Sequence, residues 1–148
     1  MLFRILLLVA LLGFTTVGWA QQAQLPLLEL LAGMHRIEAE IAATSESRQI
    51  GMMKRTVMPS QRGMLFVFPE IAKHCMWMRN TLLPLSVAFL DEKGRIINIE
   101  DMQPQTETNH CALQPARYAL EMNLGWFKNR GLGAGFAIAG IDKVPSAR

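Results

Sequence analysis

The sequence predicts a mainly β protein with one domain, either an antiparallel β sandwich or a barrel-like fold, with one or two short helices. Short apolar or alternating segments recur along the chain, and glycine and proline residues separate them. The connections are too short for repeated parallel crossovers, which need a dozen or more residues each. No internal repeat or low-complexity tract divides the chain.

The first 20 residues have the pattern of an export signal. Arg4 supplies a positive charge, residues 5–14 are an unbroken apolar run, and Gly18 and Ala20 are small residues suited to a cleavage site. The alternative is an uncleaved anchor, although the apolar run is shorter than the about 20 residues that span a bilayer. We therefore expect a signal peptide (1–20), an N-terminal tail (21–27), the domain (28–143) and a C-terminal tail (144–148). The mature protein is expected to be periplasmic or secreted, with no membrane span after cleavage.

The charge pattern argues against a nucleic-acid partner. The net charge is +3, and removal of Arg4 with the signal leaves 3 − 1 = +2. Acidic and basic residues are interspersed, as where Arg36 lies beside Glu38 and Glu40. This mixture is typical of a solvated surface rather than of a basic stripe.

The first part of the domain predicts two strands and a helix. Residues 25–31 are apolar except for Glu29, and a turn at residues 32–33 follows. Residues 35–41 alternate, so that Glu38 and Glu40 face away from the apolar side of the strand. Thr44 is a suitable N-cap for a helix from Ser45 to about Met53. That helix is expected to bury Ile50 and Met53.

The rest of the domain predicts further short strands. Residues 64–68 form a buried strand that Pro69 ends, and residues 75–78, 85–90 and 95–102 form three more. The last two flank a tight hairpin loop over residues 91–94. A long loop over 103–116 precedes a strand over 118–123, a short helix over 125–130 that ends before Gly131, and a closing segment over 136–141.

Several ordered motifs carry a resemblance to a known family. They are Arg48 with Gly51-Met52-Met53 and Arg55, Gly63-Met-Leu-Phe-Val-Phe, Trp77-Met-Arg-Asn-Thr with Pro84-Leu85, Arg117-Tyr118, and Leu120-Glu-Met-Asn123 with Gly125. From about Leu28 to Ile141 the chain resembles the domain of unknown function 192 family of small, often exported prokaryotic proteins. Met52 and Arg79 stand where that family usually has Leu and Lys. The resemblance implies a mainly β, sandwich-like fold, and it implies no reaction and no catalytic residue.

Cys75 and Cys111 are the two cysteines of the chain. In an oxidising compartment, a pair of cysteines in a small domain most simply forms a disulfide. The bond would connect a predicted strand to the long loop over 103–116 and add about 3–4 kcal/mol of stability in the chain-entropy model. A catalytic thiol pair is a weaker reading, because the chain has no Cys-x-x-Cys spacing.

Copper binding is the alternative for this region. His74-Cys75-Met76 and His110-Cys111 place two imidazoles beside two sulfurs, with Met78 nearby, and such ligands suit Cu(I). Met52, Met53, Met64 and Met122, however, fall in apolar segments, where Met usually fills a core. We therefore predict the disulfide, with no metal site and no cofactor.

A group of polar residues near aromatic strands forms the candidate binding site. Asn80 and Thr81 can bind a ligand by hydrogen bonds while Trp77 forms a stacking wall, although the same two residues commonly satisfy the backbone of a turn. Glu121 lies in an apolar strand and shares a face with Ala119 and Asn123. A buried Glu121 needs a partner, and Arg48, Arg55 and Arg117 are available. Such a cluster grips a polar ligand or simply joins structural elements.

Three functions remain open from the sequence. The first is an exported, non-enzymatic domain that binds a small polar or carbohydrate-like ligand, or an envelope protein. Its candidate residues are Arg48, Trp77, Asn80, Thr81, Glu121 and Asn123. The second is an envelope hydrolase that uses Glu121 as acid or base, which requires a second carboxylate or a histidine within reach. The third is the copper-binding protein.

Overall fold

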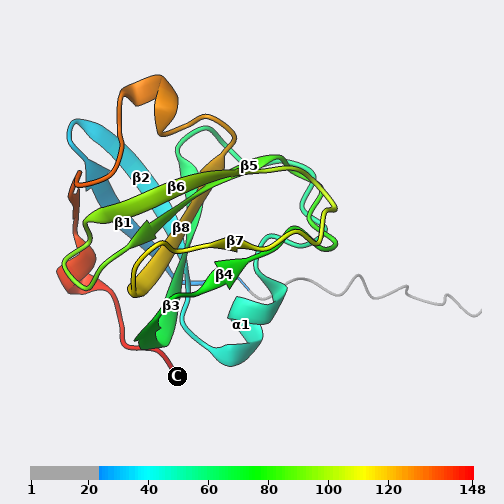
Figure 1. Ribbon diagram of the computed structural model, residues 1–148, viewed down its shortest axis with the longest axis horizontal. Coiled ribbons are helices and arrows are strands. Elements are labelled where there is room, and N and C mark those ends of the chain that lie inside the picture. The colour runs from blue at the N-terminus through cyan, green and yellow to red at the C-terminus, as the bar shows by residue number, and fades with distance from the viewer. Residues whose placement is uncertain (1–23) are drawn as a thin grey trace, which may run out of the picture.

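The computed structural model describes residues 24–148, so the expected export signal lies outside the described residues. The described chain is mainly β, as predicted (Figure 1). Its elements, in order, are β1 (Leu27–Ala32), β2 (His35–Ala42), α1 (Ser45–Ile50), β3 (Arg62–Ala72), β4 (Cys75–Met76), β5 (Leu85–Leu90), β6 (Ile96–Met102), β7 (His110–Cys111), β8 (Ala116–Asn123), the 3-10 helix η1 (Lys128–Arg130), β9 (Ile138–Ala139) and the 3-10 helix η2 (Ile141–Lys143).

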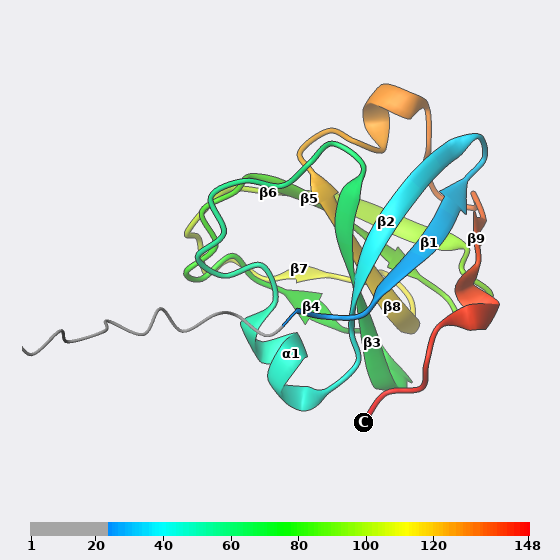
Figure 2. The same cartoon turned by 180° about the vertical axis from the view of Figure 1, so that it is seen from behind.

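Seven of the strands form one curled, barrel-like sheet in the order β6-β5-β8-β3-β2-β1-β9 (Figures 1 and 2). Neighbouring strands are antiparallel except for β2 and β3, which are parallel. Residues 43–61, which include α1, connect this parallel pair and are long enough for one crossover. We predicted no repeated parallel crossovers, and one crossover does not contradict this prediction.

Residues 135–139 connect the two edges of the sheet, formed by β1 and β6. Their β9 portion pairs with Leu31 and Ala32 of β1. On the other side, Ile138 N donates to the carbonyl of Gly94 (2.9 Å), and Ile96 N donates to that of Phe136 (2.9 Å). The curled sheet is therefore closed at this end by one short strip of chain.

Both faces of the sheet are apolar, and each has its own cover. Residues 126–141 cover one face, where a cluster includes Leu65, Leu120 and Phe127. The opposite face carries Met64, Phe66, Val87 and Ala119 and is covered by Met52 after α1, Met78 after β4 and Ala112 after β7. Figures 1 and 2 show α1 and the β4–β7 ribbon on this covered side. Burial on both faces explains the nearly continuous apolar character of β3 and β5.

Gly63 marks the closest approach of β3 to β8. A Cβ atom at this position would collide with Met122 Sδ and would lie 2.6 Å from the carbonyl oxygen of Glu121. The glycine before the Met-Leu-Phe-Val-Phe strand is therefore required by packing rather than by an unusual φ angle.

Several predicted boundaries differ from the structure, and two of these differences have a clear physical cause. Strand β3 passes through Pro69 to Ala72, because an irregularity in its pairing with β8 between Val67 and Ala72 accommodates the proline. Thr44 caps α1 as predicted, but the helix ends at Ile50, since Gly51 follows with a φ of 49°. This early end leaves Ile50 40% exposed and buries Met52 instead.

The disulfide between Cys75 and Cys111 is formed, as predicted. The two cysteines are directly opposite each other in the antiparallel β4–β7 ribbon. The loop over 103–116, for which we expected no regular structure, therefore contains the short strand β7.

At the C-terminal end of the chain, Arg148 N donates to the carbonyl of Ala43 (2.7 Å).

Candidate functional site

Glu121 lies in the middle of a row of residues that crosses five strands. The registers place Glu40 opposite Met64, Met64 opposite Glu121, Glu121 opposite Val87, and Val87 opposite Glu100. Residues that are directly paired in this way project from the same face of a sheet. Three carboxylates therefore share the face that α1 and the β4–β7 ribbon cover. Glu40 and Glu121 are buried there, whereas the Glu100 side chain, near the sheet edge, is 40% exposed.

Glu40 is neutralised by Arg55, which follows α1. Arg55 Nη1 and Nη2 donate to Glu40 Oε1 and Oε2, both at 2.6 Å, in a bidentate pair. The hydrogen bond to Glu40 is the largest of the effects that raise the pKa of Arg55. Alternation had placed Glu40 on a polar, solvated face, and this was wrong, because the crossover over 43–61 returns across that face and buries Glu40.

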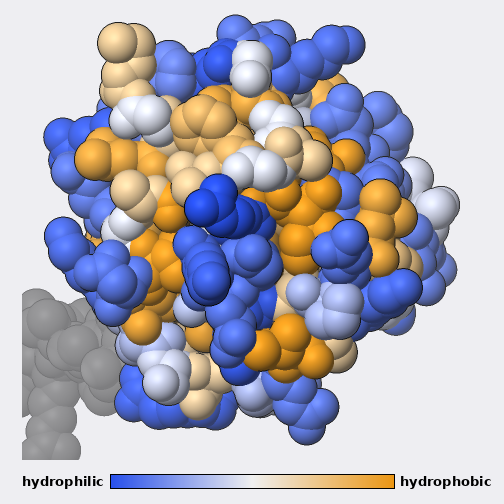
Figure 3. Space-filling view, turned by 60° about the vertical axis from the view of Figure 1, so that its left-hand side comes forward, coloured by the Kyte–Doolittle hydropathy of each residue, from blue (hydrophilic) through white to orange (hydrophobic). Residues whose placement is uncertain are grey.

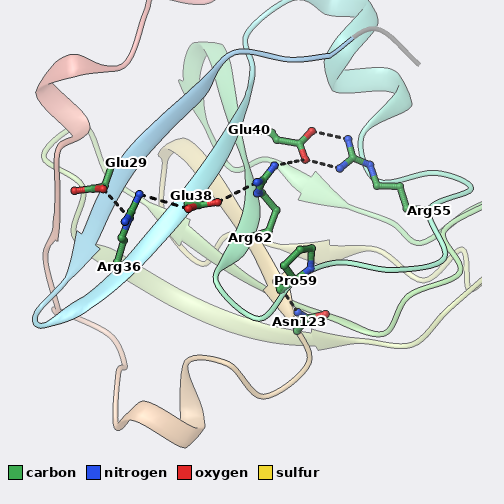
Figure 4. Close-up of polar contacts among 8 residues, drawn as sticks. All are labelled: Glu29, Arg36, Glu38, Glu40, Arg55, Pro59, Arg62 and Asn123. Atoms are coloured by element: carbon green, nitrogen blue, oxygen red, sulfur yellow. Dashed lines mark hydrogen bonds and ion pairs between the residues drawn. The ribbon is translucent and has the colours of Figure 1, made fainter. Parts of the chain in front are cut away.

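The Glu40–Arg55 pair is the end of a longer chain of ion pairs (Figure 4). Arg62 lies between Glu38 (2.9 Å) and Glu40 (3.9 Å). Arg36 lies between Glu29 (2.7 Å) and Glu38 (3.4 Å) and is exposed. Because the charges alternate in sign, the three arginines are all compensated by carboxylates other than Glu121.

Glu121 is therefore a buried carboxyl without its own ion partner. Its side chain is inside the core face, with the residue only 3% exposed. Burial raises the pKa of Glu121 to about 8, and the positive charge of Arg55 only partly opposes this effect. Among residues 24–148, no salt bridge reaches its carboxyl group, whereas the buried side-chain atoms without a hydrogen bond are Arg62 Nε and Trp126 Nε1. At neutral pH this carboxyl is mainly protonated and can both donate and accept a hydrogen bond.

A small cavity of about 30 Å³ lies against Glu121. Its walls come from α1 and the turn after it, from β3, and from the segment after the β4 strand. The lining residues are Arg48, Gln49, Ile50, Gly51, Met52, Met53, Phe66, Met76, Trp77, Thr81 and Glu121. Polar and apolar groups contribute about equally to its wall, and the carboxyl group in it is that of Glu121.

Trp77 is the large aromatic residue of this wall, and it is 45% exposed. The guanidinium carbon of Arg79 lies 5.6 Å from the centre of its ring. Arg79 also pairs with the exposed Glu107 at 3.5 Å. The indole thus lies between the cavity and solvent, where a bound molecule can contact it.

Four of the six predicted site residues line this one cavity: Arg48, Trp77, Thr81 and Glu121. The guanidinium of Arg48, however, donates to the backbone carbonyls of Ala43 (2.7 Å) and Val67 (3.1 Å). Arg48 therefore holds the start of the crossover against β3, and it does not pair with Glu121. Arg117 likewise binds backbone carbonyls, those of Phe68 (3.0 Å) and Pro69 (2.9 Å).

The two asparagines have structural positions outside the cavity wall. Asn80 has a φ of 55°, and its carbonyl accepts from Lys54 N (2.9 Å), so it belongs to a turn. Asn123 shares a sheet face with Glu121, as alternation predicted, but its amide donates to the carbonyls of Met58 (3.1 Å) and Pro59 (3.3 Å). Figure 4 shows this contact to Pro59. Thr81 combines both roles, since it closes the turn after Met78 and also lines the cavity.

Sequence reasoning missed the apolar walls of the cavity. Met52, Met53, Met76 and Phe66 come from three separate segments, and nothing in their local patterns shows that they meet. It named Arg55, with Arg48 and Arg117, only as an available partner of Glu121, and did not connect Arg55 with Glu40. The need of Glu40 for a partner would have become visible if the crossover had been predicted to cover its face.

The disulfide and the cavity bear on the two alternative functions. The sulfurs of Cys75 and Cys111 are bonded to each other, so neither is free as a thiolate ligand for copper. Among residues 24–148, no group of three or more His, Cys, Asp or Glu side chains is placed to hold a metal ion. The described wall of the Glu121 cavity contains no second carboxylate and no histidine, which the hydrolase hypothesis requires.

The molecular surface mixes polar and apolar residues. Figure 3 shows hydrophilic groups between separate apolar patches on one face. Over the part of the chain that the structure describes, no helix has the length and apolar character needed to cross a membrane.

Comparison with known proteins shows relatives without an established activity. A crystal structure from Sinorhizobium meliloti 1021, described as a candidate transcription regulator, is 34% identical (TM-score 0.70) and matches 74% of this chain and 88% of its own. A protein of unknown function from Novosphingobium aromaticivorans DSM 12444 is 30% identical (TM-score 0.75) and matches 78% and 86%. No curated protein matches the chain. The model of the family DUF192, described as "Uncharacterized ACR", matches residues 28–140, so the chain belongs to the DUF192 family.

Proposed function

We propose that this domain binds a neutral, carbohydrate-like ligand at the Glu121 cavity and does not catalyse its conversion. One observation carries the proposal: within residues 24–148, a buried carboxyl group without an ion-pair partner lines the same cavity as the half-exposed Trp77. Small-molecule sites combine apolar walls with a few precisely placed polar groups, and this wall contains both.

Glu121 supplies the main polar contact of the proposed site. A buried polar group left without a hydrogen bond costs about 1–3 kcal/mol, so a ligand that hydrogen-bonds this carboxyl is favoured over one that does not. A hydroxyl group in the cavity would supply such a hydrogen bond. The Thr81 hydroxyl, which donates to the carbonyl of Arg79 (3.3 Å), lies in the same wall and can accept a further one.

The exposed part of the cavity wall supplies apolar contacts. Trp77 and Ile50 both line the cavity and are both partly exposed. A sugar ring has an apolar face of C–H groups that packs well against an indole, while its hydroxyls remain available for hydrogen bonds. The combination of an exposed indole and a buried donor–acceptor group therefore fits an uncharged sugar better than a purely apolar or an ionic ligand.

The proposal is tested by calorimetric titration and thermal unfolding of the purified protein with a panel of methyl glycosides. For a Kd of about 1 mM, about 10 mM glycoside should raise the Tm by about 5 °C. Trp77→Ala should weaken binding by about tenfold or more, since it removes the stacking surface. The matched control is Met34→Ala, which truncates a 90% exposed side chain in the turn between β1 and β2.

Two results would contradict the proposal. The first is a panel in which no glycoside changes either the titration signal or the Tm. The second is binding that Trp77→Ala and Met34→Ala leave equally intact, because the ligand would then bind elsewhere.

A further inference from the structure

We propose that the Glu121 cavity receives the uncharged hydroxymethyl group of a hexopyranose, while the ring itself stays outside against Trp77. This inference rests on the proposed function and specifies which part of the ligand enters the protein. It follows from the size of the cavity, the charges around it and the chemistry of its walls.

The size of the cavity excludes a whole ring. Its volume of about 30 Å³ is far below the roughly 300–1,000 Å³ of sites that enclose a whole small ligand, so it holds one small substituent. The ring that carries this substituent must lie at the mouth of the cavity. There it meets Trp77 and Ile50, the two large apolar residues of the wall that remain exposed.

The charges around the cavity favour an uncharged substituent. The charged groups that approach Glu121 from α1 and the crossover are Arg48 and Arg55, and both are occupied, by backbone carbonyls and by Glu40. From β3, Arg62 on the same sheet face is bound to Glu38. An ammonium group would have to ionise the buried Glu121, and among residues 24–148 the three arginines near the cavity are already bound to other groups, so a carboxylate group would not be neutralised by them. An uncharged substituent requires no change of ionisation.

The hydrogen-bonding pattern favours a hydroxyl in particular. Because burial raises the pKa of Glu121 to about 8, its carboxyl presents one donor and one acceptor at neutral pH. A hydroxyl group presents the complementary acceptor and donor. The methylene carbon next to that hydroxyl would lie among Met52, Met53, Met76 and Phe66, whose apolar side chains line the same space.

The test compares four methyl glycosides that differ only at this substituent, each titrated at pH 7. They are the glucopyranoside, the xylopyranoside without the hydroxymethyl group, the glucuronide with a carboxylate, and the 6-amino-6-deoxyglucopyranoside with an ammonium group. We expect the glucopyranoside to bind most tightly. The other three should bind about tenfold more weakly or worse, because each leaves Glu121 unpaired or buries a charge.

Two variants with opposite expectations separate a direct role of Glu121 from a structural one. Glu121→Gln keeps a donor and an acceptor of the same size, so its affinity for the glucopyranoside should stay within about threefold of the wild type. Glu121→Met removes both and should lower glucopyranoside affinity to the xylopyranoside level while leaving xylopyranoside affinity unchanged. Tryptophan fluorescence of both variants verifies that they are folded.

The outcomes distinguish this inference from the proposed function. If the xylopyranoside binds as well as the glucopyranoside and both depend on Trp77, the ligand class stands and the inserted hydroxymethyl is wrong. If the amino sugar binds most tightly and Glu121→Gln abolishes its binding, the cavity accepts a cation, and the inference is overturned. If no glycoside binds, both fail.

Discussion

Replacing Arg55 with Met would leave Glu40 buried without its main partner. The Glu40 side chain is 11% exposed and that of Arg55 is 20% exposed, and two hydrogen bonds of 2.6 Å join them. Removing one partner of a buried ion pair costs about 3–5 kcal/mol, largely because the remaining charge is uncompensated. Arg62 stays 3.9 Å from Glu40 and offsets part of this loss. We therefore expect a loss near the lower limit, about 3 kcal/mol.

The matched control is Arg36→Met, which breaks a pair of similar length at the surface. Arg36 lies 2.7 Å from Glu29, but both side chains are more than half exposed. Such pairs contribute about 0–1 kcal/mol, so the control should lose much less stability. Urea denaturation followed by tryptophan fluorescence measures both losses, as shifts of the midpoint at a constant m-value.

A double-mutant cycle completes the test. Adding Glu40→Gln to Arg55→Met removes both charges, so the double variant should be less destabilised than the sum of the single variants by more than about 1 kcal/mol. The reasoning would be refuted if Arg55→Met cost no more than Arg36→Met, or if the two changes were additive.

Two other expectations concern Glu121 and the disulfide. Because burial raises the pKa of Glu121 from 4.5 to about 8, the folded protein retains a proton that the unfolded chain releases in this range. Stability should therefore fall as the pH rises from 4.5 to 8, by on the order of 4 kcal/mol relative to Glu121→Gln. The expectation would be contradicted if the free energy of unfolding in urea changed with pH by the same amount in the wild type and in Glu121→Gln. Replacing Cys75 and Cys111 together with Ser opens a loop of sequence separation 36 and should cost about 4 kcal/mol. Reduction of the wild type should cause a similar loss, and an intact mass that does not rise by two hydrogens on reduction would show that the bond was not present.

Local sequence signals predicted the elements that local physics determines. The strand over residues 85–90 has the bounds of β5, since a compact apolar run is set between Pro84 and a turn. Thr44 caps α1, and Gly131 follows η1 in the left-handed conformation, because caps depend on only a few neighbouring residues. Strand β3 continues past Pro69 because its partner β8 accepts an irregular register there, which the sequence of β3 alone does not reveal.

The candidate site was predicted in part for the same reason. Alternation places Glu121 on one sheet face with Ala119 and Asn123, and the structure shows that Glu121 is buried there and lines one cavity with Trp77. The choice among three arginines is a matter of tertiary packing: Arg48 and Arg117 bind backbone carbonyls, and Arg55 binds a carboxylate two strands away from Glu121. Such choices depend on how the crossover lies over the sheet, and periodicity contains no information about that.

The strip over residues 135–139 has a consequence for how the protein is made. It contacts β1, near the beginning of the domain, and also the start of β6 near its middle. A chain that ends after η1 therefore lacks this strip. Its edge strands β1 and β6 keep unpaired backbone groups, which can pair with the strands of other chains. Only the last residues of the domain remove that hazard, so premature termination in this region should yield aggregates rather than a slightly shorter folded protein.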